Sequence, residues 1–238
     1  SRVGLERVEV GFDGQPTWAA KPDAEAAAEA RALGATCGGV RVWSLYVPNG
    51  RTLADPHYAY KLDWLAALRD TAAGWLASDP DAPIALVGDW NIAPDDEDVW
   101  DMASFANSTH VSEPERAAFR AINDAGFVDV VRSFTPGPGI YTYWDYTQLA
   151  FQKRRGMRID FILGSPDLAA RVTGAEIVKD ELMRQLVDVA PQILPYMDCT
   201  WDLLDLLSPE QPRIRAAEQA ARASYGKLLE IGRASCRE

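Results

Sequence analysis

The sequence has 238 residues, a hydrophobic fraction of 47% and a formal net charge of −11 at pH 7. This length fits one large domain or one domain with an appendage, and the composition is typical of globular proteins. The acidic balance argues against a general nucleic-acid coat protein, but it is compatible with an enzyme that has a local basic groove or an acidic cation site. No apolar run approaches the roughly 20 residues of a membrane-spanning helix. Three widely spaced cysteines without a C-x-x-C pattern predict reduced, inert thiols in a cytoplasmic protein rather than a zinc site.

The first part of the chain contains two strand patterns separated by an ambiguous segment. Residues 8–12 alternate apolar and polar side chains and end in an Asp-Gly turn signal, which predicts a strand. Residues 22–35 are rich in alanine, so either a helix or a loop leading to the next strand fits them. Residues 38–46 alternate strictly, and we expect a strand that ends at Tyr46, just before a turn cluster.

A helix and a buried strand follow, and the strand ends in two polar residues. Apolar residues recur at helical spacing over residues 57–77, which predicts a helix packed on a sheet. The run that starts at Ile84 reads as a buried strand, whose alternation would point Asp89 and Asn91 the same way at its carboxyl end. Ligands usually bind at that end of an α/β sheet. Such a pair can orient a water and hold a phosphate oxygen; the alternative is an Asx-rich turn that closes a strand.

The middle of the chain continues with alternating helix and strand signals. The acidic run 95–98 is interpreted as a helix N-terminus, because acidic residues suit the first turn. Residues 112–124 predict a helix that Ser112 caps. Residues 127–131 fit a short strand or an extended link. Residues 140–146 predict an aromatic strand that would serve either as core or as a stacking surface.

The last strand pattern carries a charge, and the chain changes character after it. Residues 152–158 read as a basic loop, which would be either solvated or a DNA contact, and residues 159–163 as a buried strand. A carboxylate such as Asp160 in an apolar strand needs either a partner, here Arg158, or a function. From residue 182 to 230 no strand alternation is present and the segment looks helical. We therefore expect three parts: a partial nuclease-like domain (1–180), a helical segment (181–229) and an adapter-like scar (230–238).

Five blocks of residues occur in one order and together carry a family resemblance. They are residues 46–51 (YVPNGR), 60–62 (YKL), 88–94 (GDWNIAP), 143–146 (YWDY) and 158–163 (RIDFIL). In this order they resemble the exodeoxyribonuclease III family of the endonuclease/exonuclease/phosphatase superfamily. The resemblance implies a four-layered α/β sandwich of two mixed sheets flanked by helices, here incomplete and followed by the helical appendage. It also implies a monomeric, cytoplasmic DNA-repair enzyme that uses Mg²⁺ or Mn²⁺ to hydrolyse double-stranded DNA at 3′ ends and abasic sites.

The resemblance also implies roles for individual residues. Tyr46 would lie beside the scissile phosphate, Asn91 would contact it, and Asp89 would move the proton of the attacking water or leaving oxygen. Asp160 would orient a catalytic histidine. The implied DNA contacts are Asn49, Arg51, Lys61, Trp144 and Arg155, of which Trp144 would border the pocket for the abasic sugar. The implied metal ligands are Asp89 and, weakly, Asn91.

The chain departs from the family pattern at both ends. The family's metal-binding Glu would precede Ser1, and its closing Ser-Asp-His motif is replaced by residues 187–191 (VDVAP). The two histidines, His57 and His110, are expected to be surface residues. We therefore expect an N-terminally truncated chain with weak or no activity. The alternatives are a superfamily phosphatase or lipid phosphodiesterase, a non-catalytic remnant that binds nucleic acid, and a genuine interaction module over residues 182–229.

Overall fold

The computed structural model describes residues 3–19, 23–145, 150 and 153–177. The strands in these ranges are β1 (Glu6–Val10), β2 (Thr17–Trp18), β3 (Ala27–Ala28), β4 (Ala32–Cys37), β5 (Val40–Tyr46), β6 (Ile84–Asp89), β7 (Val128–Asp129), β8 (Tyr143–Trp144), β9 (Gly156–Met157) and β10 (Asp160–Gly164). The α-helices are α1 (Pro56–Ser78), α2 (Glu113–Asp124) and α3 (Pro166–Arg171), and two 3-10 helices are η1 (Asp96–Asp98) and η2 (Met102–Phe105). Within this part of the chain, no helix has both the length and the apolar character needed to cross a membrane.

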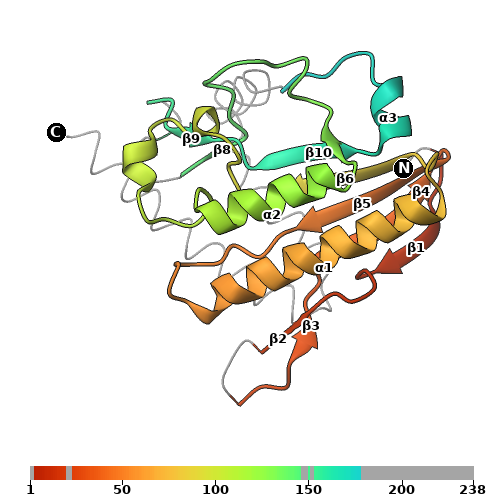
Figure 1. Ribbon diagram of the computed structural model, residues 1–238, viewed down its shortest axis with the longest axis horizontal. Coiled ribbons are helices and arrows are strands. Elements are labelled where there is room, and N and C mark those ends of the chain that lie inside the picture. The colour runs from red at the N-terminus through yellow and green to blue at the C-terminus, as the bar shows by residue number, and fades with distance from the viewer. Residues whose placement is uncertain (1–2, 20–22, 146–149, 151–152, 178–238) are drawn as a thin grey trace, which may run out of the picture. The chain divides into compact units, whose positions relative to one another are not determined.

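Six strands form one mixed sheet in the order β1-β4-β5-β6-β10-β7 (Figure 1). Only β5 and β6 pair in parallel among these neighbours, and the other pairs are antiparallel. A parallel pair needs a long crossover, which α1 provides between β5 and β6. Two further sheets, β2-β3 and β8-β9, have two strands each. The predicted mixed α/β class is confirmed.

Helices α1 and α2 lie over one face of the large sheet, and the main hydrophobic core is between them and the strands (Figure 1). Trp43, Leu86 and Leu163 are register partners on β5, β6 and β10, and all three are almost completely buried. Trp64 of α1 and Phe119 of α2 belong to the same cluster. The helical spacing of apolar residues in 57–77 thus predicted α1 correctly, because that stripe packs on the sheet.

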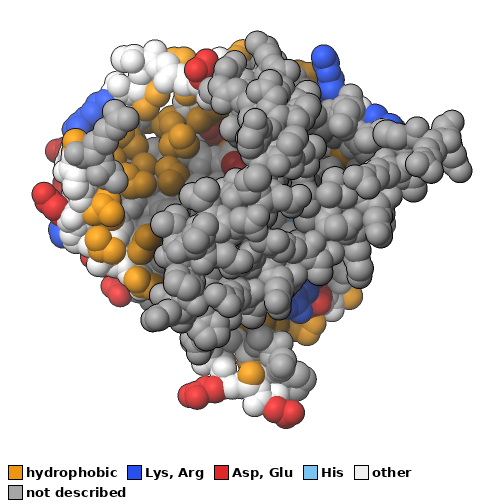
Figure 2. All heavy atoms as spheres, turned by 180° about the vertical axis from the view of Figure 1, so that it is seen from behind, with side chains coloured by type: hydrophobic (Ala, Val, Ile, Leu, Met, Phe, Trp, Pro, Cys, Tyr) orange, Lys and Arg blue, Asp and Glu red, His pale blue; other side chains and the backbone are white. Residues whose placement is uncertain are grey.

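The opposite face of the sheet is partly apolar and exposed. Leu33, Ser44, Val87 and Ile162 form a register row across four strands, and Leu33 and Ile162 are 48% and 42% exposed. Seen from this side, hydrophobic side chains gather on the described surface (Figure 2). The described residues thus supply one large sheet and its helical layer, and they contain no second sheet of comparable size.

Several local expectations are corrected. Of the two alternatives for the alanine-rich segment 22–35, the helix is excluded for the described residues 23–35, which contain β3 and the first part of β4, because β4 pairs with both β1 and β5. The acidic run forms the short η1 with a capping box, not the start of an α-helix. In the described residues 140–145 of the aromatic stretch, only Tyr143 and Trp144 form a strand, β8. The proposed segments 181–229 and 230–238 lie outside the described residues.

Candidate active site

Three candidate residues meet at one edge of the sheet because of strand register. Tyr46 ends β5 and Asp89 ends β6, and the two are partners in the parallel pair. Asp160 begins β10 and is the antiparallel partner of Asp89. Directly paired residues point to the same face of a sheet. Tyr46, Asp89 and Asp160 therefore form a row across three strands, although they are far apart in sequence.

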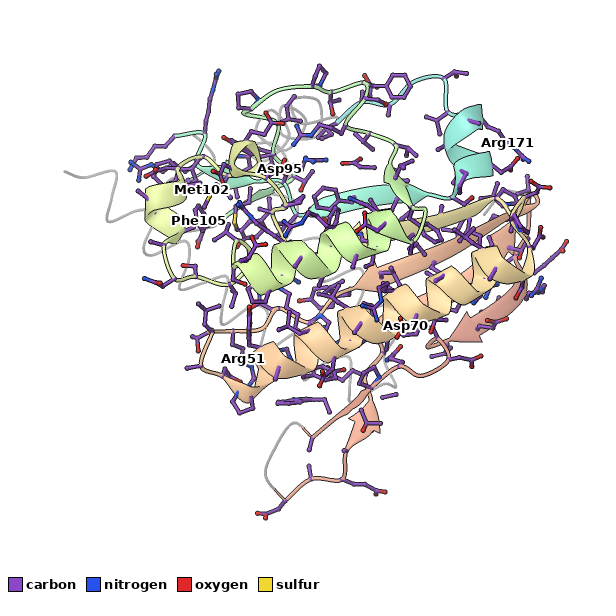
Figure 3. The ribbon with its side chains drawn as sticks, in the orientation of Figure 1. Arg51, Asp70, Asp95, Met102, Phe105 and Arg171 are labelled. Carbon is purple, nitrogen blue, oxygen red and sulfur yellow. The ribbon has the colours of Figure 1, made fainter. Side chains whose placement is uncertain are left out.

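The row opens into a cleft of about 730 Å³. Its lining includes Tyr46, Asn49, Arg51, Asp89, Asn91, Trp100, Phe105, Asn107, Ser108, His110, Tyr143, Arg155, Met157 and Ile159. Arg51, just before α1, and Phe105, in η2, come from separate segments of this lining (Figure 3). Six of the nine site residues predicted from the sequence thus line one cleft, and Asp160 is paired with one of them.

Gly88 allows the backbone at the end of β6 to adopt a positive φ angle and to pass close to β5. Its φ is +138°, and a Cβ atom there would lie 1.9 Å from the carbonyl oxygen of Leu45, so no other residue fits. Asn91 follows with φ +52°, and its backbone N–H donates to Asp89 Oδ1 at 2.8 Å. The Asx turn is therefore real, and it is also part of the cleft. The strand ends at Asp89, so the turn, not strand alternation, directs Asn91.

The carboxamide of Asn91 is held from both ends. Its Nδ2 donates to the carbonyl oxygen of Val47 at 2.9 Å. Its Oδ1 accepts from Asn49 Nδ2 at 3.0 Å and lies 3.2 Å from His110 Nε2. The residue is only 4% exposed. Because this oxygen already has two partners, the geometry argues against Asn91 as a metal ligand.

Lys61 supports the cleft from inside the protein instead of lining it. Its side chain is fully buried, and Nζ donates to the carbonyl oxygen of Asn91 at 2.7 Å and forms an ion pair with Glu115. Burial lowers the pKa of Lys61, while Glu115 opposes that shift. A direct phosphate contact by Lys61, as the family resemblance implied, is therefore wrong for this structure. The residue fixes the Asn91 backbone and links α1 to α2.

The pKa values of both aspartates of the row are raised. Burial raises the pKa of Asp89 to about 6, and repulsion from Asp160 adds to this, while the backbone N–H of Asn91 opposes it. The pKa of Asp160 is also raised, because the surrounding protein removes part of the water around its carboxyl, while a hydrogen bond from Thr142 lowers it. A carboxyl with a pKa near 6 can exchange a proton at neutral pH.

Arg158 is not the partner of Asp160. It is 2% exposed, and its guanidinium pairs with Asp98 at 2.7 Å and with Asp129. Arg158 therefore lies in the protein interior and is not part of the solvent-exposed basic loop that the sequence had predicted. Arg155 remains at the cleft, where its guanidinium lies 4.8 Å from the ring centroid of Trp100. These two residues form a cationic and aromatic part of the cleft wall.

The expected surface position is wrong for His57, which is buried, and incomplete for His110, which is half-buried in the cleft. His57 is only 5% exposed, and its Nδ1 accepts from the backbone N–H of Gly50 at 3.2 Å, which holds the loop of Asn49 and Arg51 against α1. His110 lines the cleft, and burial together with the charge of Lys61 lowers its pKa to about 4. No local pattern distinguishes either histidine from a surface residue, so sequence reasoning had no signal for them.

The aromatic wall is made by Tyr143 rather than Trp144. Neighbouring residues of a strand point to opposite faces, and Tyr143 lines the cleft whereas Trp144 packs edge-on against Tyr141, with centroids 6.4 Å apart. Met157 and Ile159 complete this wall. Tyr143, and not Trp144, is therefore the residue of this strand that borders the cleft. Among the residues that the structure describes, no group of three or more His, Cys, Asp or Glu side chains is arranged for a metal ion.

A model of the endonuclease/exonuclease/phosphatase family matches residues 1–193. The chain belongs to this family. The resemblance to exodeoxyribonuclease III is likewise confirmed: an exodeoxyribonuclease of Bacillus subtilis is 32% identical over 142 residues, which are 59% of this chain and 55% of that protein.

Solved structures agree with this assignment. A 3′ phosphatase from Neisseria bound to a product DNA hairpin is 35% identical with a TM-score of 0.63, and the match covers 71% of this chain and 62% of that one. An AP endonuclease from Archaeoglobus fulgidus is 32% identical with a TM-score of 0.62, covering 72% and 62%. The chain spans about half the length of the curated relative described above, and less than two thirds of these two solved chains.

Proposed function

We propose that this chain carries the phosphate-handling part of a metal-dependent DNA-repair phosphodiesterase. The observation that carries the proposal is the position of Asp89. Its carboxyl has a pKa near 6 and opens into the same cleft as the neutral donors Tyr46 and Asn49. Phosphodiester hydrolysis requires a group that moves one proton and donors for the developing charge on the phosphate oxygens. The relatives' names support DNA as the substrate, with 3′ ends and abasic sites as the reacting positions.

A divalent cation fits the acidic side of this cleft. Mg²⁺ takes one or two carboxylates and keeps several waters, and Asp89 and Asp160 are adjacent register partners that offer such oxygens. A bound Mg²⁺ or Mn²⁺ would supply positive charge for a phosphate oxygen and favour the ionised form of Asp89. Asp89 would accept the proton of the attacking water or protonate the leaving oxygen. Arg51 and Arg155 would attract the DNA backbone, independently of base sequence.

The experiment that tests the proposal measures Mg²⁺-dependent cleavage of duplex DNA by the 238-residue chain. Substrates with a single abasic site, a recessed 3′ end and a 3′-phosphate are compared with a small phosphomonoester, which tests the phosphatase alternative. Asp89→Asn is the inactive control, because it removes the proton-carrying group and keeps the shape. Cleavage that persists in this variant, or that is unaffected by EDTA, contradicts the proposal.

The weak activity expected from the sequence stays a prediction that the same assay tests. The proposal includes a nuclease domain over residues 1–180 in a monomeric, cytoplasmic protein. Sedimentation of the purified chain at several concentrations measures the oligomeric state. A non-catalytic, DNA-binding remnant would instead show salt-dependent binding without turnover.

A further inference from the structure

His110 lies in the cleft without an assigned role, and its backbone is held from two sides. It sits between η2 and α2 with φ +79°, a conformation that is uncommon for residues other than glycine. Its N–H donates to Glu115 Oε1 at 2.9 Å, and its carbonyl oxygen accepts from Ala93 N at 2.7 Å. The imidazole is therefore presented to the cleft by a fixed backbone.

The surroundings of the ring decide which nitrogen carries the proton. Asn91 Nδ2 is committed to the carbonyl oxygen of Val47, so Asn91 Oδ1 must face His110 Nε2 at 3.2 Å. An acceptor at this distance is favourable only when Nε2 carries a hydrogen. The hydroxyl of Thr109 lies 2.8 Å from Nδ1 and can rotate to donate to it. In the other tautomer, Nδ1–H would donate to Thr109 Oγ1 and Nε2 would accept from Asn49 Nδ2, but Nε2 would then face the acceptor Asn91 Oδ1 without a hydrogen. The contact with Asn91 therefore favours the neutral tautomer with the proton on Nε2.

This tautomer has a consequence for Asn49. Its Oδ1 accepts from the backbone N–H of Arg51 at 3.1 Å, which sets the direction of the amide. One N–H of Nδ2 donates to Asn91 Oδ1. The ring nitrogen of His110 also lies 3.3 Å from Asn49 Nδ2, but a protonated Nε2 does not accept a hydrogen bond. Within the described part of the chain, the second N–H of Asn49 has no acceptor in this tautomer, and Asn49 lines the cleft.

We propose that His110 is a positioning residue: its Nε2–H fixes the Asn91 carboxamide and leaves one N–H of Asn49 for a phosphate oxygen of the substrate. This inference rests on the proposed function for the identity of the ligand. Its geometric part concerns the free protein. Without the imidazole, Asn91 Oδ1 loses a donor and the two carboxamides are free to reorient.

Nuclear magnetic resonance of the full chain tests the geometric part without any activity. The sequence has two histidines, so the spectrum of His110→Gln assigns both rings. Long-range ¹H–¹⁵N correlations at neutral pH are expected to show His110 protonated on Nε2 and not on Nδ1. The tautomer is measured in the unmodified protein, and the variant serves only to assign the two rings. A proton on Nδ1, or a doubly protonated ring, overturns the proposal.

The variants test the effect on the carboxamides. In His110→Ala, the side-chain amide signals of Asn49 and Asn91 are expected to shift, while in His110→Gln, whose amide can donate to Asn91 Oδ1, they are expected to stay closer to their original positions. On a DNA substrate that the wild type hydrolyses, His110→Ala should lower kcat about 10- to 100-fold, by analogy with the hydrogen-bond partners that orient metal ligands, and His110→Gln should restore part of it.

The results separate the two proposals. If the wild-type chain hydrolyses no DNA, the proposed function fails, and the tautomer and amide signals still decide the role of His110. If DNA is hydrolysed and His110→Ala leaves both kcat and the amide signals unchanged, the positioning role is refuted while the proposed function stands.

Discussion

Replacing Asp89 by Asn should stabilise the folded protein at neutral pH, although it removes the central group of the proposed site. The folded state raises the pKa of this carboxyl from 3.8 to about 6. Asn keeps an oxygen that can accept from the backbone N–H of Asn91, and it carries no charge. One pKa unit corresponds to about 1.4 kcal/mol, so the expected gain in the free energy of unfolding is at most about 3 kcal/mol above pH 6.

The pH dependence of this gain follows from proton binding. Because the pKa of Asp89 is higher in the folded than in the unfolded state, the folded state binds the proton more strongly between about pH 4 and 6. Wild-type stability therefore falls as the pH rises through this window, and Asp89→Asn escapes that loss. The difference between the two proteins should be near zero below pH 4, grow through the window and level off above pH 6.

Urea unfolding followed by tryptophan fluorescence between pH 4 and 8 measures this difference. EDTA is present, because a bound cation would favour the charged form of Asp89. Asp70→Asn is the matched control, since Asp70 lies on α1 with a 70% exposed side chain and should give a difference within about 0.5 kcal/mol (Figure 3). In an Asp160→Asn background the gain should shrink, because one source of repulsion is gone. A variant less stable than wild type at pH 7.5, or a difference independent of pH, refutes the reasoning.

The other predictions concern the support of the cleft. Lys61→Met should cost about 3–5 kcal/mol in urea unfolding, because Glu115 stays buried without its cation; a loss below about 1 kcal/mol would show that Glu115 is compensated otherwise. Gly88→Ala should cost at least about 3 kcal/mol or prevent folding, as judged by circular dichroism, because its Cβ has no space. Gly74→Ala in α1, where a Cβ meets no atom within 4 Å, is its control and should stabilise by about 0.5–1 kcal/mol. Arg158→Met should cost about 1–3 kcal/mol in thermal or urea unfolding, since Asp129 loses its ion pair and the buried Asp98 keeps only Arg132 as a cationic partner, and an unchanged midpoint would contradict this.

Local sequence patterns were sufficient to predict the two long helices and the strand β5. The spacing in 57–77 and the capping residue Ser112 predicted α1 and α2 to within a residue or two, because helix periodicity and capping involve neighbours in the chain. The strict alternation in 38–46 likewise predicted β5. The five ordered blocks indicated the family, which the comparison over residues 1–193 confirmed.

Contacts between residues far apart in the sequence determined the features that local sequence patterns did not predict. The alanine-rich segment that includes β4 became a strand because two partner strands were available, which overrides a weak helix propensity. Arg158 left the predicted basic loop because Asp98, 60 residues earlier, pairs with it inside the protein. The burial of a charged side chain depends on such a partner. No residue close to Arg158 in the sequence indicates that this partner exists.

The residues of the cleft likewise fall into those that the sequence predicted and those that only the tertiary structure placed there. The sequence by itself determined that Asp89 and Asn91 lie at the carboxyl end of a buried strand and that a cluster of aromatic and basic residues comes later. Only the tertiary structure placed Asp160 beside Asp89, brought His110 to Asn91 and moved Lys61 into the interior. The physical reason is that strand register and side-chain hydrogen bonds join segments far apart in the chain, and a single sequence carries no record of those pairings.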